Sequence, residues 1–326
     1  MARYDTIGRT YRATRVADPR IEAQIQRAFG DAGTLINVGA GTGSYEPTDR
    51  RTVAVEPSPV MLAQRPPGAA PAVRATAEHL PFPDDHFDAA AALLTIHHWT
   101  DWRAGIAELR RVARRIVILT WDPDRPPAFW LTDDYLPEAL TAAHQITAPS
   151  LPELRQALGV GYFEAVPVPA DCADGFFAAF WARPEAYLDP TVRDGISCFA
   201  LIDQALVAER MDRLAADLSS GVWDARHGHL RDRSERDLGY RLVVGEPEPI
   251  TARRARADII DPADRHDITD RIDAAEPIES TEQNEPMDPN DSAEPTDPID
   301  STEPFDPIDR NESSDQSDHR ELMAER

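Results

Sequence analysis

Apolar runs alternate with amphipathic stretches along the first 250 residues, and this alternation predicts a sheet with helices on both faces. Apolar residues at helical spacing predict a helix over Pro19–Phe29, which has a proline at its start. The nearly continuous apolar run 87–95 is typical of a central parallel strand. We expect the other strands at Thr34–Val38, 52–55, 72–75, 115–121, 163–168 and 237–244, and the other helices at 57–64, 102–114 and Leu151–Leu158.

Beyond residue 121 the pattern is less regular. Residues 175–220 read as mostly helical and are rich in aromatic side chains. We therefore predict a Rossmann-like, doubly wound α/β fold with a mostly parallel sheet and lid-like helical insertions at about 122–150 and 171–236. The aromatic residues of these insertions would form either ordinary core or an apolar lid: Phe129, Trp130, Phe176, Phe177, Phe180, Trp181 and Tyr187.

The last 76 residues have a different pattern. From Asp258 to Glu321 an acidic residue stands at every third position, with prolines and small polar residues between. Such a segment cannot bury enough apolar surface to offset the entropy of ordering, which predicts a disordered acidic tail over 251–326. The tail is either a soluble repeat expansion or a polyanionic tether for an unknown cationic partner or for Ca²⁺.

Charge and composition exclude several classes of function. The formal net charge is −24 and the chain contains no lysine, so no basic nucleic-acid footprint or lipid-binding cluster is visible. Two cysteines cannot form a disulfide framework, and His227 and His229 lack a nearby third ligand, so we predict no metal site. The first residues show no secretory signal, and cytoplasmic location is the expectation.

The strongest chemical signal follows the strand Thr34–Val38, where Gly39, Gly41 and Gly43 alternate with other residues. Glycines allow positive φ and close approach of the backbone to a ligand. A dinucleotide fingerprint would carry a further glycine at the sixth position, where this chain has Ser44, so an NAD-dependent oxidoreductase is disfavoured. Glu56 closes the next predicted strand, where its carboxylate could accept hydrogen bonds from both hydroxyls of a ribose.

Two further motifs follow in order: Ala77-Glu-His-Leu-Pro-Phe-Pro-Asp-Asp-His-Phe-Asp88 and Thr95-Ile-His-His-Trp99. Together with the glycine loop and Glu56, they resemble the class I S-adenosylmethionine-dependent methyltransferases, particularly the type 11 group that includes ubiquinone- and menaquinone-biosynthesis-like enzymes. The resemblance is good over 1–121 and looser to 245.

The resemblance implies a site for S-adenosyl-L-methionine, with each role carried by a matching position. The methionine part would lie on Asn37, Gly39, Ala40, Gly41, Thr42 and Gly43, and the ribose on Glu56. Pro57, Ser58, Met61, Ala77 and Glu78 would surround the adenine, and Thr95 and His98 would face the sulfonium and the acceptor. Tyr4, Tyr11 and Arg15 lie in an N-terminal segment that often folds over the cofactor in such enzymes.

Three positions depart from the family pattern. Asn37 replaces the usual acidic residue, so contact with the methionine ammonium would run through water or a carbonyl group. Thr76 stands where an aspartate often receives the adenine amino group. The usual Pro-Gly-Gly turn before the fifth strand is missing from 112–116.

The catalytic candidates are His97, Asp122 and Tyr135. Adjacent residues on a strand end point in opposite directions, so we expect His98 to be packed and His97 to be the candidate general base. A base is required only if the acceptor is a hydroxyl, a phenol or a carbon acid.

The resulting prediction is an enzyme that transfers a methyl group to a small-molecule acceptor, without nucleic acid or membrane as partner. A non-catalytic cofactor-binding scaffold, with the tail as the working part, is the alternative, and an oxidoreductase is less favoured.

Overall fold

The computed structural model describes residues 15–123, 128–140, 148–159 and 161–245. Contacts within the chain define two units, 1–276 and 277–326, and all described residues belong to the first. Tyr4, Tyr11 and the predicted tail lie outside the described residues.

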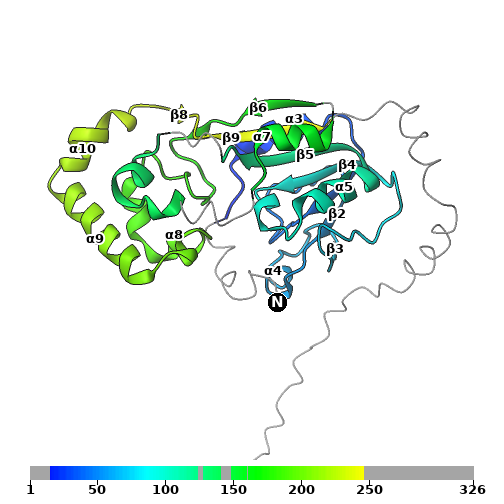
Figure 1. Ribbon diagram of the computed structural model, residues 1–326, viewed down its shortest axis with the longest axis horizontal. Helices are drawn as coiled ribbons and strands as arrows, with labels where there is room; N and C mark the ends of the chain where they lie inside the picture. Colours follow the sequence, from blue (N-terminus) through cyan, green and yellow to red (C-terminus); the bar gives the residue numbers. More distant parts are fainter. Residues whose placement is uncertain (1–14, 124–127, 141–147, 160, 246–326) are drawn as a thin grey trace, which may run out of the picture. The chain divides into compact units, whose positions relative to one another are not determined.

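Seven strands form the main sheet in the order β3-β2-β1-β4-β5-β9-β6 (Figure 1). The first five strands in this order are mutually parallel, whereas β9 runs antiparallel to both β5 and β6. Their bounds are Thr34–Val38 (β1), Arg51–Val55 (β2), Ala72–Val73 (β3), Phe87–Leu93 (β4), Ala113–Trp121 (β5), Gly161–Ala165 (β6) and Tyr240–Gly245 (β9). Because parallel strands share a direction, the loops after β1, β2 and β4 meet at one edge of the sheet.

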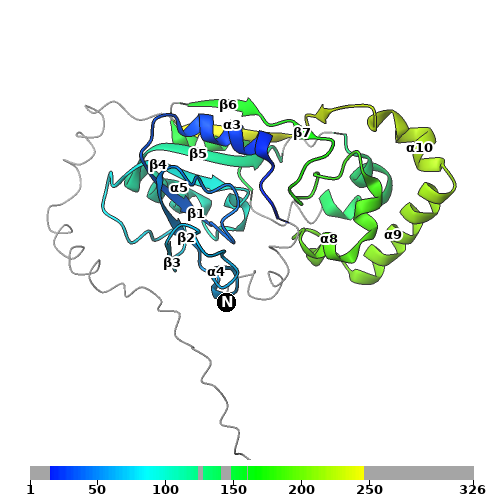
Figure 2. The ribbon, with the colours of Figure 1, turned by 180° about the vertical axis from the view of Figure 1, so that it is seen from behind.

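Successive side chains of the central strands enter two different cores, as the two-residue period of a strand requires. On one face, Leu35, Ala91 and Val117 pack with the helix α3 (Pro19–Phe29), which lies in front of the sheet in Figure 2. On the other face, their chain neighbours pack with α5 (Trp102–Val112) and α7 (Leu151–Leu158). The result is a three-layer arrangement in which both faces of the sheet are covered.

A helical region follows β5 and is built around buried aromatic side chains. We use the name for residues 128–140 and 168–236. Its elements are the π-helical turn η2 (Leu131–Tyr135), the strands β7 (Val168–Pro169) and β8 (Glu235–Arg236), the 3₁₀ turns η3 (Pro184–Leu188), η4 (Phe199–Leu201) and η5 (Gly228–Leu230), and the helices α8 (Pro190–Asp194), α9 (Gln204–Ser219) and α10 (Val222–His227). β7 and β8 pair antiparallel, and α8, α9 and α10 lie together (Figures 1 and 2). The predicted aromatic residues pack into one core with α3, five of them buried and Phe177 and Phe180 partly buried.

The predicted α/β fold class is confirmed, and most predicted elements lie within two or three residues of the observed ones. The predicted helix 57–64 shortens to α4 (Pro59–Leu62). The predicted strand 163–168 is divided between β6 and β7. Val166 lies between these two strands, and its N–H donates to the Tyr240 carbonyl. Much of 175–203 forms 3₁₀ and other turns, and the long helix begins only at Gln204, after the Asp203 cap.

The missing Pro-Gly-Gly turn has a structural consequence. α5 ends at Val112 and β5 begins at the next residue, because Ala113 caps the helix in an extended conformation. The chain therefore passes from helix to strand without a loop.

Candidate functional site

A groove of about 570 Å³ lies at the edge of the sheet where β1, β2 and β4 end. Thirteen of the predicted site residues line it, and they come from five separate stretches of chain. They are Arg15, Asn37, Gly39, Ala40, Gly41, Thr42, Glu56, Pro57, Met61, Ala77, Glu78, Thr95 and His98. The fold thus brings together residues up to 83 positions apart, as the resemblance implied.

The loop after β1 requires glycine for two reasons. Gly39 and Gly41 have φ values of +71° and +55°, which side-chain-bearing residues rarely adopt. A Cβ at Gly39 would also lie only 2.8 Å from Thr95 Cβ and would overlap the Thr95 hydroxyl. The N–H groups of Gly39 and Ala40 donate to the Val55 carbonyl at 2.8 and 3.0 Å, which fixes the loop against β2. The absence of side chains therefore keeps this wall of the groove open.

Glu56 is the buried acid of the groove, with 5% of its surface exposed. Its Oε2 accepts a hydrogen bond from the Gly41 N–H and its Oε1 one from the Ser58 N–H, both at 2.9 Å. These bonds fix the orientation of the Glu56 carboxylate, and a carboxylate oxygen can accept more than one hydrogen bond. Ser58 is fully buried and caps α4 by accepting from the Met61 N–H, so it supports this wall without lining it.

Glu78 lines the groove, but its carboxylate also joins two loops. Its Oε1 accepts hydrogen bonds from the N–H groups of Thr100 and Asp101, at 2.8 and 3.1 Å. Burial raises the pKa of Glu78, and these backbone bonds together with one from the Thr76 side chain outweigh it, so the pKa lies below its usual value. Glu78 thereby anchors the loop that leads into α5.

The structure corrects the expected orientation of the two adjacent histidines. They lie on the 3₁₀ turn η1 (Ile96–His98), not on a strand end, so their side chains do not alternate. Their ring centroids are 3.8 Å apart, and His97 is buried against Trp121 at 4.4 Å. His98 lines the groove, as expected for a cofactor contact, whereas His97, the candidate general base, does not, so the packed position that we expected for His98 belongs to His97.

The other two catalytic candidates lie away from the groove lining. The Asp122 N–H donates to the Gly239 carbonyl beside β9. The Tyr135 hydroxyl donates to Asp217 Oδ2 at 2.8 Å within the helical region, where burial and that carboxylate raise its pKa.

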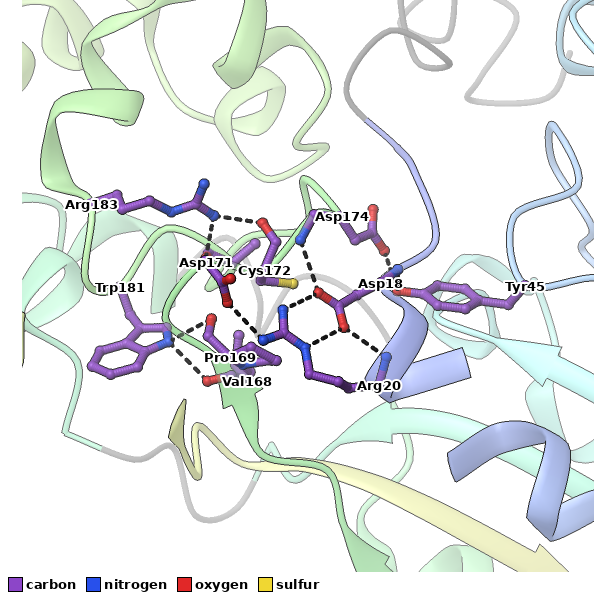
Figure 3. Close-up of polar contacts among 12 residues, drawn as sticks. Asp18, Arg20, Tyr45, Val168, Pro169, Asp171, Cys172, Asp174, Trp181 and Arg183 are labelled. Atoms are coloured by element: carbon purple, nitrogen blue, oxygen red, sulfur yellow. Dashed lines mark hydrogen bonds and ion pairs between the residues drawn. The ribbon is translucent and has the colours of Figure 1, made fainter. Parts of the chain in front are cut away.

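A polar junction that the sequence did not predict involves two lining residues of the groove, Arg15 and Tyr45. Arg15 Nε and the Tyr45 hydroxyl donate to the two carboxylate oxygens of Asp174, at 2.6 and 2.9 Å. Next to it, Asp18 accepts from Arg20 and from the Ala173 N–H (Figure 3). Burial raises the pKa of Asp18, but these hydrogen bonds outweigh it and lower the pKa to about 2.

Nine groove residues were not predicted as ligand contacts, although Trp99 lies within a predicted motif and Ser44 directly follows the glycine loop. They are Ser44, Tyr45, Arg74, Ala75, Thr76, Leu93, Leu94, Trp99 and Thr100, of which Thr76 was weighed only as a departure. Tyr45 and Leu94 have φ values of +64° and +53°, a strained conformation for such residues. Their neighbours in sequence are the glycine loop and Thr95, so position next to a predicted motif is the one signal that could have found them.

Two negative observations concern the described residues alone. No group of three or more His, Cys, Asp or Glu side chains there could hold a metal ion. No helix among them has the length and apolar character needed to cross a membrane.

Comparison with known proteins identifies the family. Residues 36–119 match a family model described as a methyltransferase domain. A protein of Anabaena variabilis, assigned as a methyltransferase of an antibiotic biosynthesis pathway, is 34% identical, with a TM-score of 0.66 and coverage of 71% of this chain and 98% of that chain.

Two other solved structures are more distant. A SAM-dependent methyltransferase of Thermotoga maritima is 20% identical, with a TM-score of 0.38 and coverage of 51% of this chain and 79% of its own. The geranyl diphosphate C-methyltransferase of Streptomyces coelicolor is 15% identical, with a TM-score of 0.40 and coverage of 70% and 77%. No match was found among curated proteins.

The ubiquinone- and menaquinone-biosynthesis-like subgroup stays a prediction, because none of these matches addresses it. The similarity over nearly the whole length of the Anabaena protein agrees with the matched methyltransferase domain and with the glycine loop and acid at the sheet edge. The chain therefore belongs to the class I S-adenosylmethionine-dependent methyltransferases, which transfer a methyl group from that cofactor.

Proposed function

We propose that the groove holds S-adenosylmethionine with its ribose on Glu56, its methionine part over the glycine loop, and its adenine between Met61 and Ala77. The observation that carries this proposal is the Glu56 carboxylate, which lines the groove and is fixed by the N–H groups of Gly41 and Ser58. Two preoriented acceptor oxygens suit a pair of neighbouring hydroxyl groups.

The acceptor is proposed to be a small molecule that enters beside Thr95 and His98. Methyl transfer needs the acceptor atom in line with the methyl group and the sulfur, so alignment in a site shielded from water supplies much of the acceleration. The chain's net charge of −24 disfavours a nucleic acid as substrate.

His98 is the proposed general base in place of His97, because it is the histidine that lines the groove. It would accept a proton from an acceptor that is a hydroxyl, a phenol or a carbon acid. An acceptor that is already nucleophilic would need only to be positioned by the groove.

Residues 1–250 are proposed as the catalytic domain, located in the cytoplasm, and 251–326 as an acidic tail that methyl transfer does not need. A chain ending at residue 250 would then turn over like the full chain, and loss of turnover in that shorter chain would contradict this division.

Glu56→Ala tests the cofactor site. It removes two charge-assisted hydrogen bonds within the loop and the proposed ribose acceptor, so we expect S-adenosylmethionine affinity to fall by at least about 30-fold. Titration calorimetry measures this fall, with Glu209→Ala as the matched control because that carboxylate is exposed on α9. Unchanged affinity in Glu56→Ala would defeat the assignment, as would tighter binding of NAD than of S-adenosylmethionine by the wild type.

The acceptor can be sought directly. Tritiated S-adenosylmethionine is incubated with the protein and a small-molecule extract of the host, and the labelled product is identified by mass. Label that appears in nucleic acid or protein, rather than in a small molecule, would contradict the proposed acceptor class.

A further inference from the structure

A second buried carboxylate, Glu46, lies behind the glycine loop. Its Oε1 accepts a hydrogen bond from the Asn37 amide nitrogen, Nδ2, at 3.1 Å. Its Oε2 lies 2.6 Å from Arg65 Nη2, and the two side chains of this ion pair are only 6% and 7% exposed. Glu46 does not line the groove, whereas Asn37 does.

Arg65 is itself held in place. Its guanidinium donates to the carbonyl groups of Gly41 and Ala70, at 3.4 and 2.9 Å. A Cβ at Gly43 would lie 3.1 Å from Glu46 Oε2 and 3.3 Å from Arg65 Nη1, so the ion pair packs directly against the loop. The position of Glu46 is therefore determined from both sides, and its carboxylate cannot turn away from Asn37 at low cost.

This arrangement determines which end of the Asn37 amide faces Glu46. An ionised carboxylate only accepts hydrogen bonds, so the amide must present its NH₂ group to Glu46. The remaining polar atom of the side chain is the carbonyl oxygen, Oδ1. A reversed amide would set two acceptors against each other and would turn a donor toward the groove. Glu46 thus selects an acceptor for the groove, which suits a cationic N–H donor in the ligand.

We propose that Glu46 is a positioning residue that orients the Asn37 amide, and that Asn37 Oδ1 binds the α-ammonium group of S-adenosylmethionine. The inference rests on the proposed function, which places the methionine part of the cofactor over the glycine loop. Asn37 stands where the family usually has an acidic residue. The inference explains how a neutral amide, oriented by the buried Glu46 carboxylate, can present an acceptor oxygen at that position.

Two ligands separate orientation of Asn37 from general support of the loop. S-adenosylhomocysteine carries the α-ammonium, whereas 5′-methylthioadenosine keeps the nucleoside and the sulfur but has no amino-acid part. In Glu46→Gln the amide at position 37 is free to reverse. We expect the affinity for S-adenosylhomocysteine to fall about tenfold and that for methylthioadenosine to change less than about twofold.

Asn37→Ala is the companion variant, because it leaves the Glu46–Arg65 pair intact. It should show the same selective loss even if Glu46→Gln does not fold. In the double variant Asn37→Asp/Glu46→Gln, the carboxylate stands at position 37 and the amide donor at position 46, at the same net charge. The groove thus keeps an acceptor at position 37, and we expect most of the lost affinity for S-adenosylhomocysteine to return.

Calorimetry of the full-length chain with both ligands gives a distinct result for each outcome. Equal losses for the two ligands would make Glu46 a support of the loop and overturn the inference, as would no loss in either single variant or a double variant that stays weak. Failure of the wild type to bind either ligand would instead overturn the proposed function, and the inference with it.

Discussion

The groove and the helical region are determined by different physical requirements. In the groove, Gly39, Glu56 and Thr95 are restricted by backbone geometry and hydrogen bonding. In the helical region, Trp181, Tyr187 and Trp223 are fully buried and are restricted by volume and ring packing. A groove residue is replaceable only by one of the same shape and chemistry, whereas a core aromatic contributes mainly apolar area.

This difference predicts a separation of effects. Changes in the groove should lower ligand affinity more than stability, and changes in the helical region should lower stability more than ligand affinity. Asp174 connects the two regions, because it belongs to the helical region and binds Arg15 and Tyr45 at the groove. The separation should be weakest at that junction and strongest far from it.

Trp181→Ala should give the largest effect. The indole is fully buried and donates to the carbonyl groups of Val168 and Pro169, at 3.0 and 3.3 Å. Its removal leaves a cavity and two carbonyl groups without this donor, so we expect the free energy of unfolding to fall by about 3–5 kcal/mol. Urea denaturation measures this loss, and calorimetry on the folded fraction should find S-adenosylhomocysteine affinity within about twofold of wild type.

Tyr162→Ala is the control for Trp181→Ala, because Tyr162 is an aromatic residue of β6 with 41% of its surface exposed. It should cost less than about 1 kcal/mol. A large loss of affinity in Trp181→Ala, with folding intact, would break the separation between the two regions.

Gly39→Ala should give the next largest effect, and here we expect the loss in cofactor affinity rather than in stability. The new Cβ would overlap the Thr95 hydroxyl while the backbone holds a φ of +71°. The loop must move to relieve both, so we expect cofactor affinity to fall about 100-fold, which corresponds to about 2.7 kcal/mol. Gly68→Ala is the matched control, since Gly68 has a φ of +90° and a Cβ added there would meet no described atom within 4 Å.

The control separates backbone strain from blockage of the groove. Gly68→Ala should cost about 1 kcal/mol of stability and leave the affinity unchanged. Comparable affinity losses in both variants would mean that strain alone, and not the contact with Thr95, explains the requirement for glycine at position 39.

The sequence predicted the groove far better than the helical region. The loop after β1, Glu56 and Thr95 each follow a strand whose apolar run is visible, and parallel strands bring such loops to one edge. Asp174 could not be predicted in this way, because it meets Arg15 across 159 residues with no motif at either end. Long-range side-chain contacts of this kind depend on the packed fold.

The histidines show a second limit of the sequence. Which of His97 and His98 faces the groove depends on whether β4 continues or ends, and β4 ends at Leu93. Leu94 has a positive φ, and the chain then turns into a 3₁₀ helix. No local pattern of residues predicts that change. A small difference in where the strand ends was enough to reverse the assignment.

Tyr135→Phe should give the smallest effect and the sharpest test of the helical region's part in catalysis. The variant keeps the buried ring and loses the hydrogen bond to Asp217 at 2.8 Å, so we expect a stability loss of about 1 kcal/mol. Since Tyr135 does not line the groove, kcat should stay within about twofold of wild type, whereas loss of a general acid or base would lower it by about 100-fold or more.

The pH dependence adds an independent check on Tyr135. Burial and Asp217 raise the pKa of its hydroxyl in the folded protein, so the folded state keeps a proton that the unfolded state releases above about pH 10. This residue therefore contributes a fall in stability as the pH rises beyond that value, and Tyr135→Phe should lose that share. Denaturation curves at pH 8 and about pH 11 would measure the difference between the two proteins, and an equal fall in both would show that the Tyr135–Asp217 contact does not hold the proton. A drop in kcat at constant stability would instead mean that Tyr135 takes part in the reaction. The helical region would then contribute to catalysis as well as to stability.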